Sequence, residues 1–156
     1  MKKNNHLYLG KAGYLTIMAE FLVRGWNVVK PKVDIGDGIF VVQDENRLLK
    51  CVQVMTSTST SRKNGFSAQF QVPLIQLTNA NDLYYVFMVR HNDRWTKPVI
   101  INQKFLLDYY QNSKIGTESN GNLNLYFSYS TDKVECSGFD LTKYVSDYSD
   151  FPIIED

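Results

Sequence analysis

Three residues in the first part of the chain have side-chain oxygens that could do chemistry together: Glu20, Asp37 and Gln53. Asp37 stands in a glycine-rich turn before an apolar run over residues 39–42, and Gln53 lies inside the next apolar run, over residues 49–55. If the two runs pair as a hairpin, Asp37 and Gln53 come together near one end of a sheet. Glu20, on the more polar side of a predicted helix, adds a second carboxylate. If a metal ion binds such oxygen atoms, Mg²⁺ or Mn²⁺ is expected.

The alternation of a strand decides which side chains accompany Gln53. Cys51, Gln53 and Met55 share one face of the predicted strand, whereas Lys50 and Val52 point to the other. A glutamine inside an apolar strand must find hydrogen-bond partners, because burying an unpaired amide costs free energy. Gln53 is therefore the hardest of the three oxygen-bearing residues to explain as ordinary surface.

Each of these residues also has a plainer interpretation, and both interpretations stay open. An aspartate beside glycines is common in turns, which would account for Asp37. Glu20 is spaced to pair with Arg24 on a solvated helix face, an arrangement that the sequence favours over metal binding. Met55 taken alone is a packing residue.

The elements that would position these residues follow from periodicity. Leu15, Met18 and Leu22 recur at helical spacing and predict a helix over residues 11–24, ended by Gly25. Strands are predicted over residues 26–29, 39–42, 49–54, 66–72, 83–89, 99–101 and 123–129. Asn102 predicts the N-cap of a second helix, and Asp140 the start of a short last one.

The remaining segments are predicted to be loops and turns between these helices and strands. Residues 113–122 are rich in Gly, Asn and Ser and predict a loop, and the hydroxyl run over residues 56–61 predicts a mobile one. Residues 90–94 are most simply a turn, with His91, like His6, at the surface. The order of elements predicts a single α/β domain over residues 1–156, in which a central mixed sheet is flanked by helices.

An ordered set of short motifs resembles the PD-(D/E)XK, or restriction-endonuclease-like, nuclease superfamily. The residues that carry the resemblance are Gly10-x-x-Gly13, Ala19-Glu20-Phe21-Leu22-x-x-Gly25-Trp26-x-Val28-x-x-Pro31, Asp34-x-Gly36-Asp37 and Gln53-Val54. They cover about the first third of the chain, and the remainder matches only as an order of elements.

The resemblance implies an αβββαβ core and a set of roles. Asp37 and Gln53 would hold one or two Mg²⁺ or Mn²⁺ ions, and Glu20 would be the helix-borne carboxylate that some members add. Such a metal polarises the scissile phosphate and supplies a hydroxide-like nucleophile. The family's motif lysine, two residues after Gln53, would orient the water and offset developing charge.

The sequence departs from the family at two positions. Met55 stands where the motif lysine belongs, and a thioether neither carries positive charge nor donates a hydrogen bond. Tyr14 stands where some members have a glutamate. A lysine can migrate in this superfamily, so Lys50, Lys11 or Lys63 are candidates, although Lys50 faces the wrong way unless its strand has a bulge.

Charge and composition limit the partners. Residues 1–65 carry ten Lys and Arg against five Asp and Glu, and residues 66–156 carry seven against eleven. The basic first half would attract nucleic acid, although counts alone favour a plain solvated surface. Four cations are the expected nucleic-acid contacts: Lys11, Lys50, Arg62 and Lys63.

The cellular setting is expected to be reducing. No apolar run is long enough for a membrane span, no signal-like segment follows the first lysines, and the two cysteines lack a CxxC partner. We therefore expect free thiols, a cytoplasmic protein and no membrane partner.

Three functions follow, in this order of preference. The first is a nuclease-fold protein with impaired hydrolysis that binds nucleic acid or protein and needs no cofactor. The second is an active Mg²⁺-dependent DNA endonuclease with a migrated lysine. The third is a non-catalytic protein-interaction domain, for which the tyrosine-rich acidic half or a homo-oligomer would supply the interface.

Overall fold

The computed structural model describes residues 5–29, 39–79 and 82–155, so Asp37 lies outside the described residues. The elements of the first half are α1 (Asn5–Val23), β1 (Asn27–Val29), β2 (Ile39–Gln43), β3 (Leu49–Thr58), β4 (Thr60–Arg62), β5 (Gly65–Pro73) and α2 (Leu74–Thr78). Those of the second half are β6 (Leu83–His91), β7 (Arg94–Trp95), β8 (Val99–Asn102), α3 (Gln103–Ser113), β9 (Thr117–Ser119), β10 (Asn122–Ser130), β11 (Lys133–Cys136), β12 (Phe139–Asp140) and the 3₁₀ turn η1 (Thr142–Tyr144).

The central sheet is mixed, as predicted. Its strands lie in the order β1-β2-β3-β6-β7, and β8 also pairs with β6. The first three strands form an antiparallel meander, whereas β3 and β6 run parallel from the Cys51–Leu83 pair to the Thr58–Arg90 pair. The predicted hairpin is confirmed, with Ile39 opposite Gln53. This order and the flanking helices confirm the predicted α/β class, with β4 and β5 inserted between β3 and α2.

A second, antiparallel sheet was not predicted from the sequence. It has the strand order β12-β11-β10-β5-β4, with β9 beside β10. Its longest pairing joins β5 to β10, from Phe66 opposite Tyr129 to Pro73 opposite Asn122. The predicted loop over residues 113–122 is partly wrong, because β9 lies inside it.

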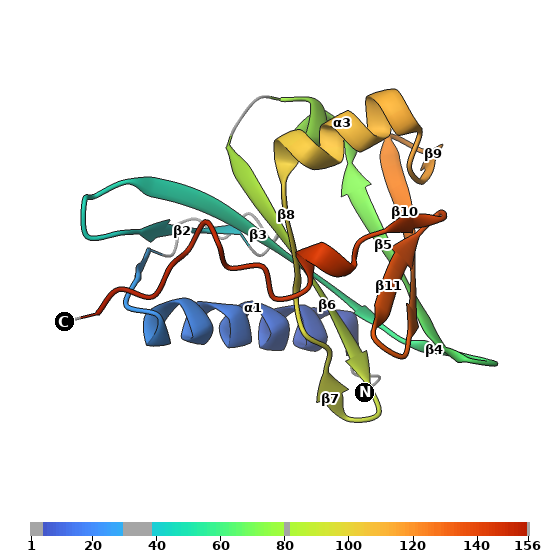
Figure 1. The fold of residues 1–156 in the computed structure, drawn as a ribbon, viewed down its shortest axis with the longest axis horizontal. Coiled ribbons are helices and arrows are strands. Elements are labelled where there is room, and N and C mark those ends of the chain that lie inside the picture. Colours follow the sequence, from blue (N-terminus) through green and yellow to red (C-terminus); the bar gives the residue numbers. More distant parts are fainter. Residues whose placement is uncertain (1–4, 30–38, 80–81, 156) are drawn as a thin grey trace.

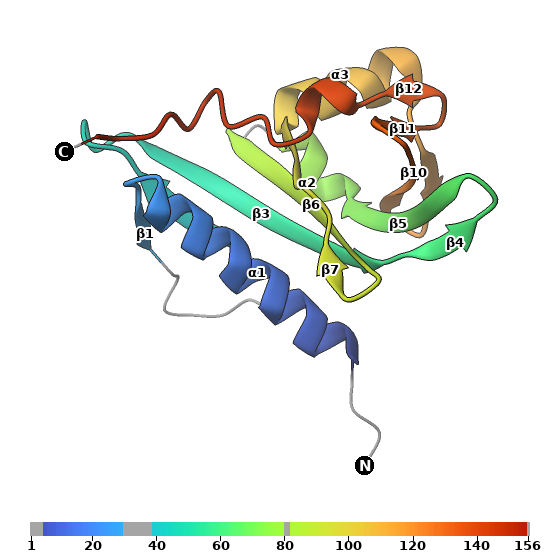
Figure 2. The same ribbon diagram turned by 60° about the horizontal axis from the view of Figure 1, so that its bottom comes forward.

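The two sheets and α1 form three layers, with a core between each pair (Figures 1 and 2). α1 covers one face of the central sheet, where Phe21 packs edge-on against Phe40. The second sheet, with α2 and α3, covers the other face, where Phe70, Phe87 and Phe127 meet. Burial on both faces explains why β6 is apolar from Leu83 to Val89.

α1 is longer than the predicted helix. It begins at Asn5 rather than near residue 11, because its first turns are exposed and leave no buried stripe in the sequence. Its predicted end is confirmed: Gly25 has a φ of 87°, and Trp26 N–H donates to Phe21 O at 3.0 Å. Within the described ranges, no helix combines the length and the apolar character needed to cross a membrane.

The predicted mobile loop over residues 56–61 is wrong. β3 continues to Thr58, and Thr60 opens β4, which pairs with β5 as a hairpin. Threonine is β-branched and packs well on a pleated strand, so a hydroxyl-rich run fits an edge hairpin as well as a loop. Ser59 N–H donates to Arg90 O at 3.1 Å, which ties this hairpin to the end of β6.

The segment after η1 returns across the molecule to α1. Phe151 is fully buried, with its ring against those of Phe21, Trp26 and Tyr84. Trp26 Nε1 donates to Pro152 O at 2.9 Å, which fixes the segment to the start of β1. A contact between segments more than a hundred residues apart in the sequence thus completes the core on the α1 side.

Candidate functional site

The N-terminal half of α1 crosses β3 at very short range. A Cβ atom at Gly13 would lie 2.3 Å from Thr56 Cγ2 and 3.3 Å from Trp95 Cη2, whereas one at Gly10 would lie 3.7 Å from Thr56 Oγ1. Only glycine fits at residue 13 without displacing its neighbours. Packing therefore explains Gly13 of the Gly10-x-x-Gly13 pair but not Gly10, and it places this half of α1 beside β7.

Gln53 belongs to a buried amide network on the face away from α1. It is 5% exposed, and its strand neighbours Cys51 and Met55 pack into the core between the two sheets, as the alternation predicts. Its Oε1 accepts from Gln76 Nε2 at 3.0 Å, and Gln76 Oε1 accepts from the Tyr85 hydroxyl at 3.0 Å. Burial raises the pKa of Tyr85 and keeps it a neutral donor.

Gln103 extends this network and fastens α2 in place. Its side chain is 3% exposed; its amide donates to Leu77 O at 3.1 Å and to Gln76 O at 2.8 Å, and its Oε1 accepts from Leu83 N–H at 3.3 Å. The buried amides of Gln53 and Gln103 therefore both have the hydrogen-bond partners that their burial requires.

The other predicted metal ligands are not brought together with Gln53 in the described part of the chain. Glu20 lies on α1, beyond the opposite face of the sheet, with its carboxylate 3.6 Å from Arg24 Nη1. Arg24 in turn lies over the Tyr148 ring at 4.1 Å. Asp37 precedes Ile39 by two residues in the sequence, and its own position is not described.

The oxygens that are described do not fit a metal site. The Gln53 oxygen already accepts a hydrogen bond inside the core, and the Glu20 carboxylate faces an arginine. Among residues 5–29, 39–79 and 82–155, no three His, Cys, Asp or Glu side chains gather closely enough to hold a metal ion. We therefore derive no step through a metal from these residues.

Tyr14 occupies the helix position where some members of the resembled family have a glutamate. Its hydroxyl donates to Ile39 O at 3.3 Å, at the first residue of β2. Its ring packs edge-on against Phe40, with centroids 5.4 Å apart. A tyrosine at this position thus fastens α1 to the start of β2 without contributing a carboxylate.

The position of the motif lysine is apolar, and the nearest lysine in the sequence is held elsewhere. Met55 is half-buried against the core between the sheets. Lys50 points to the opposite face, as predicted, where its Nζ donates to Asp150 O at 2.5 Å and lies 5.0 Å from the centroid of the Phe151 ring. Lys50 is therefore not placed to replace the missing lysine beside Gln53.

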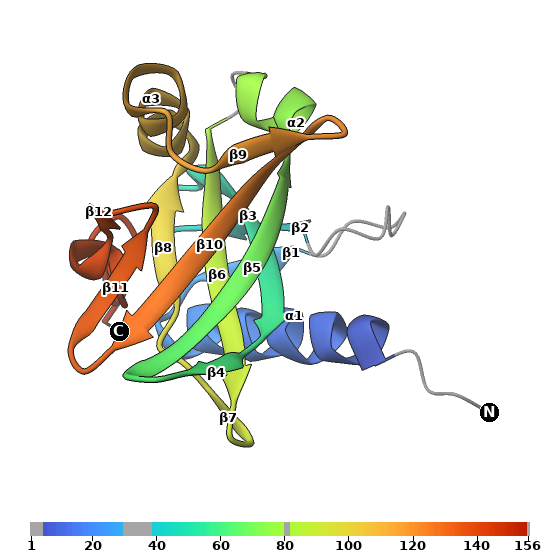
Figure 3. The ribbon, with the colours of Figure 1, turned by 90° about the vertical axis from the view of Figure 1, so that its right-hand side faces the viewer.

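The β4–β5 and β6–β7 hairpins contact each other at the lower end of Figure 3, although their tips point in different directions in Figures 1 and 2. The His91 ring stacks on Phe66 with centroids 3.8 Å apart, and Ser59 Oγ lies 2.7 Å from His91 Nδ1. His91 is therefore half-buried, rather than the plain surface residue that the sequence suggested. These contacts join the β4–β5 hairpin to the β6–β7 hairpin as one surface.

This pair of hairpins is rich in cations. Within the described residues, four of its basic side chains have no Asp or Glu within ion-pair distance: Arg62, Lys63, Arg90 and Arg94. Arg62 Nε donates to Ser67 Oγ at 2.9 Å. We call these four residues the hairpin cations. Arg62 and Lys63 were predicted as nucleic-acid contacts, whereas Arg90 and Arg94 were not.

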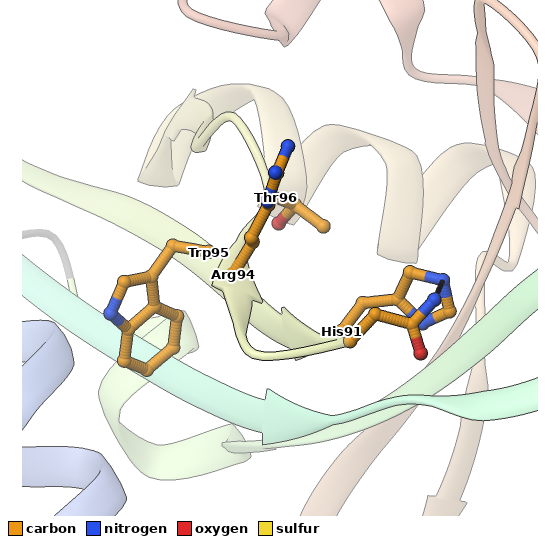
Figure 4. Close-up of a pocket in the computed structure, with 5 residues that line it drawn as sticks. His91, Arg94, Trp95 and Thr96 are labelled. Atoms are coloured by element: carbon orange, nitrogen blue, oxygen red, sulfur yellow. Dashed lines mark hydrogen bonds between the residues drawn. The ribbon is translucent and has the colours of Figure 1, made fainter.

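A shallow, open pocket of about 460 Å³ lies on the β6–β7 hairpin (Figure 4). It is lined by His91, Asn92, Arg94, Trp95 and Thr96. The predicted turn is confirmed, since Asn92 and Asp93 both have positive φ, as a two-residue hairpin turn requires.

The side chains of the pocket spread to different sides of the turn. Figure 4 shows the Trp95 and His91 rings on opposite sides, with Arg94 standing apart from both. The Arg90 guanidinium lies 5.3 Å from the Trp95 ring centroid. Arg90, Arg94 and Trp95 were not predicted from the sequence as functional residues. Their pattern, an aromatic residue among the basic residues Arg90, Arg94 and Lys97, could have indicated a nucleic-acid contact.

The predicted cation Lys11 lies on the exposed side of α1. Its Nζ is 5.2 Å from the centroid of the Tyr14 ring. Because α1 passes Trp95 at Gly13, Lys11 lies on the half of the helix that adjoins the β6–β7 hairpin. The structure thus groups Lys11 more closely with the hairpins than with Lys50.

Comparisons with known proteins give a distant structural likeness. No family model matches the chain, and no curated protein matches it. A solved structure described as that of a bacterial homing endonuclease, I-Ssp6803I, is similar over 65% of this chain and 72% of its own, with 17% sequence identity and a TM-score of 0.45. A likeness this distant identifies no family, and no functional argument rests on it.

Proposed function

We propose that this chain is a nucleic-acid-binding protein of the nuclease-like type described above, with impaired hydrolysis. The observation that carries the proposal is the set of four hairpin cations, which lack an acidic partner among the described residues and lie on two hairpins in direct contact. Unpaired arginines and lysines on one surface attract a phosphate backbone, and their binding releases its counterions.

The aromatic side chains of the same surface fit a nucleic-acid ligand. Trp95 is half-buried and its ring lies 5.3 Å from the Arg90 guanidinium, so a phosphate bound by Arg90 and a base stacked on the ring could be held together. Stacking tolerates any base, because every base has a π face. We therefore propose that binding depends little on sequence.

Two positions of the nuclease motif that the structure describes support the proposed impairment of hydrolysis. Met55 offers no charge where the resembled family has a lysine, and Lys50 is held on the far side of the sheet by Asp150. The Gln53 oxygen accepts from Gln76 inside the core. A transition state that gains negative charge at this position would lack the charge that the motif lysine supplies.

The binding test compares a hairpin cation with an ion-paired lysine elsewhere. Arg94→Ala is expected to weaken binding of labelled DNA and to reduce the slope of log affinity against log salt by about 0.9. Lys104→Ala is the matched control, because Lys104 is exposed on α3 and lies 3.2 Å from Asp82. Failure of the wild type to retain DNA at low salt would refute the proposal and favour the protein-interaction function.

The hydrolysis test uses supercoiled plasmid and single-stranded DNA with Mg²⁺ or Mn²⁺. The wild type and Asp37→Ala are both expected to leave these substrates intact. Met55→Lys restores the motif lysine on β3, and metal-dependent cleavage gained by this variant would assign the impairment to the missing lysine rather than to the engaged Gln53 oxygen. Strong cleavage by the wild type would overturn the proposed impairment.

An active Mg²⁺-dependent nuclease is the second candidate, and the register of the hairpin favours it. Ile39 lies opposite Gln53, so the chain enters β2 beside the motif strand two residues after Asp37. On this alternative, Asp37 and Gln53 would hold the metal, and Lys11 or Lys63 would replace the lysine. Cleavage by the wild type that disappears in Asp37→Ala would establish this alternative.

A further inference from the structure

The outward face of α1 is as apolar as the face that it buries. Leu15 is 50% exposed and Leu22 is 58% exposed, and Ala12 and Ala19 on the same side are exposed as well. The four residues are spaced three, four and three apart, so they form one stripe along the helix. We call them the α1 stripe. A stripe of this spacing is typical of a helix that packs against another helix.

No described element covers the α1 stripe. The helix rests on the central sheet through Ile17 and Phe21, and its other side lies at the outside of the molecule (Figures 1 and 2). A helix with apolar residues on both sides normally lies inside a protein or an assembly. We therefore expect a binding partner to cover the exposed stripe.

We propose that the α1 stripe is a homodimer interface, in which the α1 helices of two copies pack antiparallel. A two-fold axis requires a surface that is complementary to itself. The stripe meets this requirement, because Leu15 would face the partner's Ala19 while Leu22 faces the partner's Ala12. Each large side chain then enters a gap left by a small one, in the manner of knobs into holes.

The amount of exposed apolar surface agrees with a dimer of moderate affinity. Five large side chains on the outside of α1 are each at least half exposed: Leu7, Tyr8, Leu15, Leu22 and Val23. At about 200 Å² for each full side chain they offer at most roughly 600 Å² per copy, or about 1,200 Å² for the pair, because Leu7 and Val23 lie on opposite sides of the stripe and would be covered only in part. This area is at the lower end of specific interfaces, so a micromolar dissociation constant is expected.

The charges on α1 favour a second copy over a lipid surface. A helix that lies on a membrane usually has a polar side rich in Lys and Arg. Within residues 5–23, α1 has a single lysine, Lys11, and a single acidic residue, Glu20. None of the four residues of the stripe is charged, and Lys11, one turn before Leu15, is long enough to keep its ammonium in water at the border of the interface.

Sedimentation at concentrations up to about 100 µM tests the proposal, because that range populates a micromolar dimer. The wild type is expected to approach twice the 18.0 kDa mass of one chain. Leu15→Glu and Leu22→Glu each place two carboxylates in the symmetric interface. Each is expected to raise the dissociation constant at least about 100-fold.

A matched variant and a lipid control complete the experiment. Ile75→Glu makes the same kind of change at a side chain that is 75% exposed on α2, beyond the other face of the sheet, and should leave the dimer intact. Circular dichroism identifies any variant that fails to fold. If one of the two glutamate variants fails to fold, the other tests the interface. A wild type that stays at the mass of one chain would overturn the proposal, whether or not it binds phosphatidylcholine–phosphatidylserine vesicles. Dimers in both glutamate variants would overturn it too.

Discussion

Two glycines of α1 face the same threonine of β3 but have very different amounts of space. A methyl group at Gly10 would meet Thr56 Oγ1 at 3.7 Å, an ordinary contact, whereas one at Gly13 would meet Thr56 Cγ2 at 2.3 Å. Replacing each glycine by alanine therefore separates the conformational benefit of alanine in a helix from the steric cost of the crossing.

The expected magnitudes follow from these distances. Gly10→Ala should stabilise the protein by up to about 1 kcal/mol, because alanine is the better helix former and restricts the unfolded chain. Gly13→Ala has the same benefit but must move Thr56 or the helix by about an ångström, since carbon atoms pack at about 3.5 Å. Overpacking of this kind costs about 1–3 kcal/mol, so the variant should be destabilised relative to Gly10→Ala by about that amount.

Urea unfolding measures the difference, and a second substitution assigns its cause. Thr56→Ser removes the methyl group that Gly13→Ala would strike. In that background Gly13→Ala should lose most of its penalty, which gives a coupling free energy of about 1–2 kcal/mol. Equal stabilisation by Gly10→Ala and Gly13→Ala in the wild type would refute the close crossing of α1 and β3.

Three further predictions concern buried groups. Phe151→Ala should cost about 3–5 kcal/mol in the free energy of unfolding measured in urea, because it empties the fully buried site between the Phe21 and Trp26 rings; a loss below about 1 kcal/mol would show that the segment does not complete the core. Burial raises the pKa of the Cys136 thiol to about 11, so this thiol should resist a thiolate-specific reagent at neutral pH in the folded protein and react after unfolding; rapid labelling of the native protein would contradict its burial. Burial, helped by the charge of Glu20, raises the pKa of Tyr148 to about 12. The contribution of Tyr148 to stability is therefore complete below the unfolded pKa of about 10 and disappears as pH rises through 12. Tyrosinate absorbance and unfolding measured together should show a loss of stability above pH 10, and constant stability from pH 10 to 12 would contradict this pKa.

The strands with strong alternation were predictable, because their pattern reflects the burial of one face. Residues 66–72 and 123–129 alternate in the sequence and lie on β5 and β10. Their pairing with each other was not predictable. It joins segments about fifty residues apart, and periodicity shows which face is buried but not which strand lies alongside.

The candidate site was predictable only in part, for a similar reason. The face that Gln53 shares with Met55 followed from strand alternation, and the pairing of Glu20 with Arg24 followed from helix spacing. The contact between the β4–β5 and β6–β7 hairpins, through Phe66 and His91, depends on how the two sheets pack. No local pattern in the sequence indicates that packing, so Arg90 and Arg94 were not predicted as nucleic-acid contacts.

The long return of the chain to α1 has a consequence for how the protein folds during synthesis. Arg24 and Trp26 receive hydrogen-bond partners from Phe151 and Pro152, which follow them by 127 and 126 residues. Until the ribosome has produced that segment, the aromatic side chains at the end of α1 lack their cover, and such exposed surface attracts chaperones or other nascent chains. Closing so large a loop also slows folding. The layer that contains α1 is therefore completed only after Phe151 and Pro152 have been synthesised.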